Sequence, residues 1–128
     1  VIMHWTTGLI LGTVFQLAHV VEGLEQPLPN EQGVIENDWA IHELHTTSDF
    51  ARNNLFLNWY VGGLNFQIEH HLFPNISHIH YRKIAPIVER TAKEYGLNYN
   101  LKPSFTAALL SHIRRLKELG RPLPVSAT

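Results

Sequence analysis

The residues best suited to chemistry lie in one short run, Gln67-Ile68-Glu69-His70-His71. On a helix, residues three and four positions apart occupy neighbouring points of one face, so this spacing places Gln67 beside His70 and His71. Imidazole is the commonest metal-binding side chain. The run therefore predicts a metal site on one face of a helix.

The two adjacent histidines favour more than one ion. Consecutive residues diverge by about 100 degrees around a helix. His70 and His71 therefore suit two different metals, or one metal and a supporting contact, better than one ion approached from one side. A dinuclear centre is the economical interpretation. In the alternative, one histidine hydrogen-bonds a neighbour and the other faces solvent.

The first segment of the chain is apolar, and no Lys, Arg, Asp or Glu occurs between Val1 and Val21. About twenty such residues cross a hydrocarbon core of roughly 30 Å as a helix. We predict a transmembrane helix over residues 1–22, with a buried helix of a soluble bundle as the alternative. His19 lies inside this segment, and a polar residue within a span is itself a hint of function.

The segments on either side of the histidine pair predict short helices and loops. Residues 23–38 are rich in Pro, Gly and Asn, which indicates a loop. Residues 39–54 show a mixed pattern. Residues 55–73 predict two helical pieces around Gly62-Gly63, ended by Pro74.

Two amphipathic helices are predicted in the remaining sequence. The first has apolar residues at helical spacing from Ile84 onward and ends at Gly96. Pro86 lies inside it, and its regular part is expected to start there, because the missing N–H of proline costs little in a first turn. Ser104 caps the second, which ends at Gly120 and carries basic residues in its last turn. Such positive charge lies on a solvated helix face or against anionic lipid headgroups.

The composition argues against some kinds of partner and metal site. The 128 residues include 10 Lys and Arg against 11 Asp and Glu, and the net charge of -1 gives no electrostatic case for nucleic acid. Cysteine is absent, so disulfides and thiolate metal sites are excluded. Nine residues are histidine, which is the one unusual number in the composition.

The sequence around the pair, from Asn58 through Gly62-Gly63-Leu64-Asn65-Phe66 to Pro74, closely resembles the third histidine box of membrane fatty acyl desaturases. Gln67 in place of the first histidine is similar to the front-end desaturases of the linoleoyl-CoA or delta-6 type, which place a double bond between an existing one and the carboxyl end. The resemblance covers nearly the whole chain.

This resemblance implies a fold and a set of ligands. The fold class would be all-α: the C-terminal part of an integral membrane helical enzyme, with one transmembrane helix and a cytosolic region over residues 39–120. Two irons would be held by histidines of three boxes and one more on a membrane helix. By this resemblance, His70 and His71 correspond to the ligands of the third box, and His19 corresponds to the ligand on the membrane helix. Gln67 could bind iron through its carbonyl oxygen or hold a water beside it.

The resemblance also implies partners. Dioxygen would be activated with electrons from a cytochrome b5 or a ferredoxin, and the substrate would be a fatty acyl chain on coenzyme A or a lipid. The protein would sit in a lipid bilayer with its histidines on the cytoplasmic side. Asn65 and Glu69 flank the box and are candidates for orienting a ligand imidazole.

The other histidines receive no ligand role. His42 and His45 stand where the family usually has Gln and a small residue, which favours surface or interface positions. His78 and His80 follow the Pro74 turn, where turn hydrogen bonds are the simplest interpretation. His4 and His112 have no partner at metal spacing.

The first two boxes of the family, His-x-x-x-His and His-x-x-His-His, do not occur in this sequence. We therefore expect residues 1–128 to be the C-terminal portion of a desaturase domain, inactive alone. Alternatives are a related membrane di-iron hydroxylase or ketolase and a non-catalytic interaction module. A soluble zinc hydrolase is disfavoured because its His-Glu-x-x-His spacing is absent.

Overall fold

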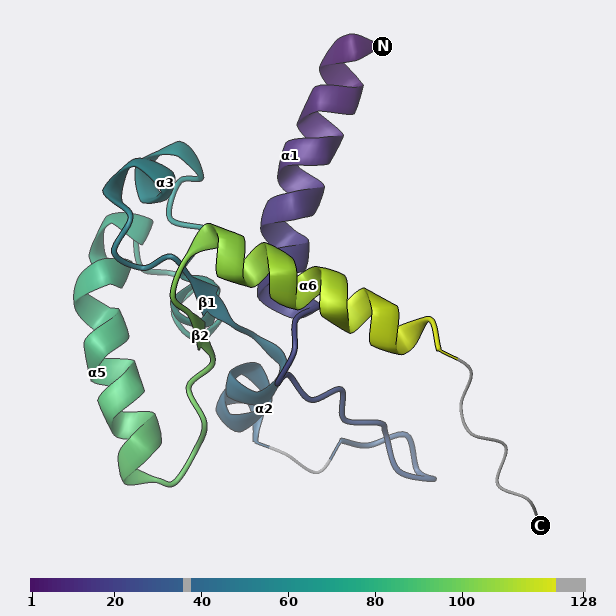
Figure 1. Cartoon of the computed structure of the whole chain (residues 1–128). Coiled ribbons are helices and arrows are strands. Elements are labelled where there is room, and N and C mark those ends of the chain that lie inside the picture. Colours follow the sequence, from purple (N-terminus) through teal and green to yellow (C-terminus); the bar gives the residue numbers. More distant parts are fainter. Residues whose placement is uncertain (36–37, 122–128) are drawn as a thin grey trace.

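The computed structural model describes residues 1–35 and 38–121, and most of this part is helical (Figure 1). The elements in chain order are α1 (Ile2–His19), α2 (Trp39–Thr46), β1 (Asp49–Phe50), α3 (Leu55–Tyr60), α4 (Gln67–Leu72), the 3-10 turn η1 (His78–His80), α5 (Tyr81–Glu94), β2 (Leu101–Lys102) and α6 (Phe105–Leu119). The prediction of a helical class is confirmed.

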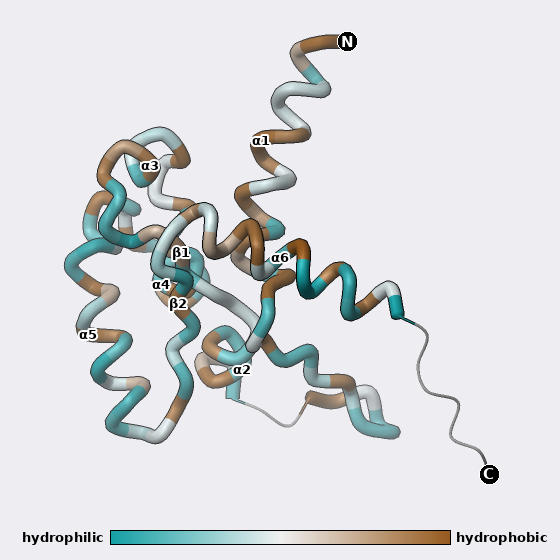
Figure 2. The backbone as a smooth tube through the Cα atoms, in the orientation of Figure 1, coloured by the Kyte–Doolittle hydropathy of each residue, from teal (hydrophilic) through white to brown (hydrophobic). Residues whose placement is uncertain are grey.

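α1 begins and ends near the predicted limits of 1–22. Its N-terminal half projects from the body of the molecule, whereas Val14, Leu17 and Ala18 near its other end are buried (Figure 1). Within the described residues, no helix is both long and apolar enough to cross a membrane. The predicted transmembrane helix is therefore not confirmed. The threonines and glycines of α1 lower its hydropathy, and Figure 2 shows pale stretches between the hydrophobic ones along this helix.

A pair of very short strands joins the two halves of the chain. β1 and β2 are parallel, with Asp49 opposite Leu101 and Phe50 opposite Lys102. The end of α1 is tied to them, because Ser48 donates its N–H to the carbonyl of Ala18 at 2.8 Å. These two strands, of two residues each, were not predicted, although the mostly helical class stands. Two residues are too few for a periodic pattern to reveal a strand.

Two apolar clusters surround this pair. The first joins α1, β1 and α6, and its buried members are Val14, Leu17, Ala18, Phe50, Ala51, Val61 and Ala108. The second lies where α2, α4 and α5 meet, and its buried members are Leu44, Ile68, Val88 and Ala92. The histidine-bearing helix α4 is thus packed between α2 and α5.

The predicted pair of helical pieces around Gly62-Gly63 is confirmed as α3 and α4. Asn54 caps α3 by accepting the Leu57 N–H at 3.0 Å. Both glycines have positive φ, 61° at Gly62 and 79° at Gly63, a conformation that residues with a side chain rarely adopt. The chain reverses here because glycine permits it.

Alanine at these two glycines should have unequal effects. A Cβ on Gly63 would lie 2.8 Å from the Cβ of His78. A Cβ on Gly62 would have no atom within 4 Å. Gly62→Ala is expected to lower the free energy of unfolding by about 1–2 kcal/mol, the cost of a left-handed alanine. Gly63→Ala should lose about 1–3 kcal/mol more through overpacking. Thermal midpoints of the two full-length variants in detergent check this, and equal midpoints would contradict it.

The last two helices differ in how well the sequence predicted them. α6 follows the prediction, because Ser104 accepts the Ala107 N–H at 3.1 Å and Gly120 caps the other end. α5 starts at Tyr81 and not at Pro86, which lies inside it. The predicted start was wrong because Tyr81 and Ala85 are buried against Phe66, and this packing offsets the hydrogen bond that proline lacks.

Candidate metal centre

Three histidines from two distant segments come together. His19 is the last residue of α1, and its ring centroid lies 5.2 Å from that of His71 on α4. The His70 and His71 rings are 5.8 Å apart, nearly perpendicular at 80°. The structure therefore brings together the three histidines that were predicted as ligands.

A carboxylate on α2 orients His71. Glu43 Oε2 lies 2.6 Å from His71 Nδ1, and both side chains are partly buried, at 15% and 31% exposure. A carboxylate accepts a hydrogen bond, so Nδ1 carries a proton, and in the neutral ring Nε2 then holds the lone pair. This tautomer presents Nε2 as a metal donor, which is the arrangement in which a carboxylate supports a ligating histidine.

His70 has a weaker partner. Its Nδ1 lies 3.4 Å from the Tyr81 hydroxyl, at the start of α5. Burial and, secondarily, the neighbouring His71 lower the pKa of His70. The imidazole is thereby kept neutral, which is the form that binds metals.

Gln67 is the fourth predicted ligand. It has no exposed surface, and neither its amide oxygen nor its amide nitrogen has a hydrogen-bond partner. A buried polar group without a partner costs about 1–3 kcal/mol. Because Gln67 lies one helical turn before His70 and His71, its amide suits a metal ion or a water held at that face. The donor set of imidazoles and one amide therefore fits a metal.

The set is nevertheless incomplete as a site. Among residues 1–35 and 38–121, no three His, Cys, Asp or Glu side chains are grouped closely enough to hold an ion. One side of a metal centre could be built from the four predicted ligands, His19, Gln67, His70 and His71. Its other ligands would come from segments outside this chain. Their assignment as metal ligands stays a prediction.

The remaining histidines have other surroundings. His45 Nδ1 lies 3.0 Å from Glu25 Oε2. His112 donates to the carbonyl of Val20 at 2.6 Å, which links α6 to the end of α1. His4, His78 and His80 are exposed. No ligand role was predicted for any of these five histidines.

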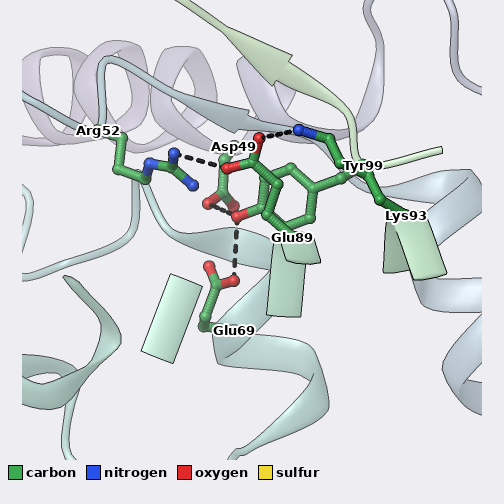
Figure 3. Close-up of polar contacts among 6 residues, drawn as sticks. All are labelled: Asp49, Arg52, Glu69, Glu89, Lys93 and Tyr99. Carbon is green, nitrogen blue, oxygen red and sulfur yellow. Dashed lines mark hydrogen bonds and ion pairs between the residues drawn. The ribbon is translucent and has the colours of Figure 1, made fainter. Parts of the chain in front are cut away.

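A buried acidic cluster on the far side of α4 was not predicted. The Tyr99 hydroxyl oxygen lies 2.6 Å from Asp49 Oδ2 and 3.0 Å from Glu69 Oε1 (Figure 3). Neither carboxyl group has exposed surface. Glu69 therefore contacts Tyr99, and Asn65 donates to the Phe50 carbonyl at 3.3 Å. In the described part of the chain, neither side chain has a hydrogen bond to a histidine ring, so the role of Glu69 and Asn65 in orienting a ligand imidazole is not confirmed.

Two buried carboxylates this close cannot both ionise easily. Burial and then the charge of Asp49 raise the pKa of Glu69 to about 9. Burial also raises the pKa of Asp49, and burial beside two acids raises that of Tyr99. Glu69 consequently keeps its proton at neutral pH, and Tyr99 stays neutral.

This protonation predicts a pH dependence of stability. The pKa of Glu69 is raised from 4.5 to about 9 on folding, so the folded protein holds a proton that the unfolded chain has lost. Stability should therefore fall as pH rises from about 4.5 to about 9, by at most about 1.4 kcal/mol per pH unit. Glu69→Gln should remove this slope. Thermal midpoints of the chelator-treated full-length protein and of this variant, measured across that range, check the prediction; parallel curves would contradict it.

Comparison with known proteins identifies the family of the chain. Residues 1–103 match the fatty acid desaturase family, and the chain belongs to that family. It is 45% identical to the sn-1 linoleoyl-lipid 6-desaturase of Synechocystis over 94% of this chain and 34% of that protein. It is 48% identical to the enzyme of the same name from Arthrospira platensis, over 93% of this chain and 32% of that one.

A third relative is the acyl-lipid (8-3)-desaturase of Physcomitrium patens, 46% identical over 89% of this chain and 24% of that protein. The chain thus spans about a third or less of the length of these curated relatives. No solved structure matches the chain.

Proposed function

We propose that this chain is the C-terminal, histidine-bearing part of an acyl-lipid desaturase that uses two irons and dioxygen. The observation that carries the proposal is the contact between the His19 ring of α1 and the His71 ring of α4. His70 lies beside His71, and the unpartnered amide of Gln67 is one helical turn before them. The names of the relatives, which specify linoleoyl-lipid and acyl-lipid desaturation, support an acyl chain on a lipid as substrate.

The reaction would convert two adjacent CH2 groups of the chain into CH=CH. Dioxygen, two electrons and two protons would be consumed and two water molecules formed, with the electrons supplied by a cytochrome b5 or a ferredoxin. Iron, when bound, would supply the oxidising power for removing the two hydrogens.

The residues of this chain would hold and orient that cofactor. His19, His70 and His71 would each offer a neutral ring nitrogen, and Gln67 its amide oxygen. Glu43 would fix the tautomer of His71. The remaining ligands would come from segments outside this chain.

We also propose an integral membrane location, with the histidines on the cytoplasmic side. The N-terminal half of α1 exposes large apolar residues such as Trp5, 77% exposed, and Leu9, 72% exposed. On α3, Phe56 and Trp59 are exposed as well. Aromatic residues of this kind favour the membrane interface. These surfaces would face lipid or the segments outside this chain.

The fatty acid profile of a host that lacks this activity tests the proposal. The host would express the full-length protein together with an electron donor, and gas chromatography would resolve its fatty acids. A new unsaturated peak supports desaturation. A hydroxylated product would instead establish a related hydroxylase, and purified protein without iron or new product would favour a non-catalytic role.

A further inference from the structure

The helix that carries the predicted ligands cannot fix its own orientation. α4 has only six residues, and Phe66 at its N-cap position makes no side-chain cap. Helices of this length are unstable by themselves, and their geometry is set by the groups that pack around them. The direction in which the histidines point must therefore be set from outside α4.

Asp49 supplies one such contact. Its Oδ1 accepts the N–H of Ile68, in the first turn of α4, at 3.0 Å. This is the bond that an N-cap side chain ordinarily makes, here supplied from 19 residues earlier in the chain. Asp49 is itself held in place, because its N–H donates to the carbonyl of Asn100 at 2.9 Å in the β1–β2 pair.

Tyr99 supplies a second contact. Its hydroxyl lies between Asp49 and Glu69 and bonds both, at 2.6 Å and 3.0 Å (Figure 3). The Tyr99 ring is in turn packed under the guanidinium of Arg52, 5.8 Å from its centroid. Arg52 is paired with Glu89 of α5 at 2.7 Å. The hydroxyl thus occupies a fixed position between the strands and α4.

The rotation of α4 follows from these contacts. Glu69 is two residues from both Gln67 and His71, which places it about 200 degrees around the helix from each, on nearly the opposite side. Holding Glu69 toward Tyr99 turns Gln67 and His71 the other way. It also directs His71 toward Glu43 on α2 and His19 on α1.

We propose that Asp49 and Tyr99 are positioning residues, which fix the rotation of α4 so that Gln67, His70 and His71 present their donor atoms to one metal centre. The inference rests on the proposed function, because it concerns iron held by those residues. Neither residue touches the metal or the substrate in this account. They act through Ile68 and Glu69.

Tyr99→Phe in the full-length protein removes the hydroxyl and keeps the ring. We expect iron retention during dialysis against a chelator to fall about tenfold, the lower end for loss of a supporting contact. The kcat should fall with it, while the KM for the acyl substrate stays within about twofold, as for a change that leaves ground-state binding intact. Tyr95→Phe is the matched control, because Tyr95 is 78% exposed, and it should leave all three values unchanged.

A second control distinguishes a general loss of stability from the loss of the positioning contact. Ala108 is fully buried in α6, and Ala108→Gly weakens the fold without changing the acidic cluster of Asp49, Glu69 and Tyr99. Its thermal midpoint should fall as far as that of Tyr99→Phe or further, with iron retention unchanged. If Ala108→Gly loses iron to the same extent, stability alone explains the effect and the inference is overturned.

Substitution of Asp49 tests the positioning role independently. It also replaces the first test if the Tyr99→Phe protein does not accumulate. Asp49→Asn keeps an oxygen that accepts the Ile68 N–H, whereas Asp49→Ala does not. We expect iron to be retained better by the asparagine variant, and equal retention in both would overturn the inference. If the unaltered protein neither binds iron nor desaturates, the proposed function fails; if it does both and the variants match it, only the positioning role fails.

Discussion

Replacing His71 by alanine in the full-length protein is expected to abolish desaturated product and remove most of the bound iron. Loss of a group that merely supports a metal ligand costs about 10–100-fold in affinity or activity, so loss of the ligand itself should cost on the order of 100-fold or more. His71 is the residue on which the contacts converge, since Glu43, His19 and His70 all lie against its ring. His70→Ala should behave in the same way.

Product and iron are measured together for these variants. The fatty acids of the expressing host give the product, and metal analysis of the purified protein gives iron per chain. His4→Ala is a matched control on an exposed histidine and should be without effect. A His71→Ala protein that keeps both its iron and its activity would contradict the ligand assignment.

Glu43→Ala is expected to reduce iron retention and activity by about 10–100-fold, while the protein continues to fold. The carboxylate lies 2.6 Å from His71 Nδ1, and without it the imidazole is free to rotate and to change tautomer. Glu43→Gln retains an oxygen acceptor, so its loss should be smaller than that of alanine.

Chelator dialysis and activity assays of the two variants check this order. Glu94, which is 64% exposed on α5, offers the matched control Glu94→Ala. Equal losses for alanine and glutamine would show that charge matters and not the hydrogen bond. No loss in either would show that Glu43 does not support a ligand.

The sequence predicted the ligand-bearing side of the site because helical spacing is local. Gln67, His70 and His71 are related by one helical turn, and Gly62-Gly63 marks the break before them. The meeting of His19 with His71 was expected only from the resemblance to desaturases. No local pattern relates residues that lie so far apart along the chain.

The residues that support α4 could not be predicted for the same reason. Asp49 and Tyr99 reach Glu69 from segments that are 20 positions before and 30 positions after it in the sequence. Each occurs in a short segment without a periodic pattern. Their contacts arise from the parallel pairing of β1 and β2, which depends on the folded chain as a whole.

The contact of Glu43 with His71 was not predicted. Glu43 lies in residues 39–54, where the sequence shows a mixed pattern. It lies between His42 and His45, for which no ligand role was predicted, and a single glutamate there resembles an ordinary surface residue. The packing of α2 on α4 places its carboxylate 2.6 Å from His71. Tertiary packing, and not local spacing, defines this contact.

A chimera tests the central claim, that this chain supplies a working part of a desaturase iron centre. The chain would replace the matching 121 residues of the Synechocystis sn-1 linoleoyl-lipid 6-desaturase, to which it is 45% identical. The account predicts that the chimera makes the unsaturated fatty acid of the parent enzyme, detected by gas chromatography, and that His71→Ala within the grafted part abolishes it. A chimera that accumulates like the parent, yet binds no iron or yields no unsaturated product, would contradict the claim.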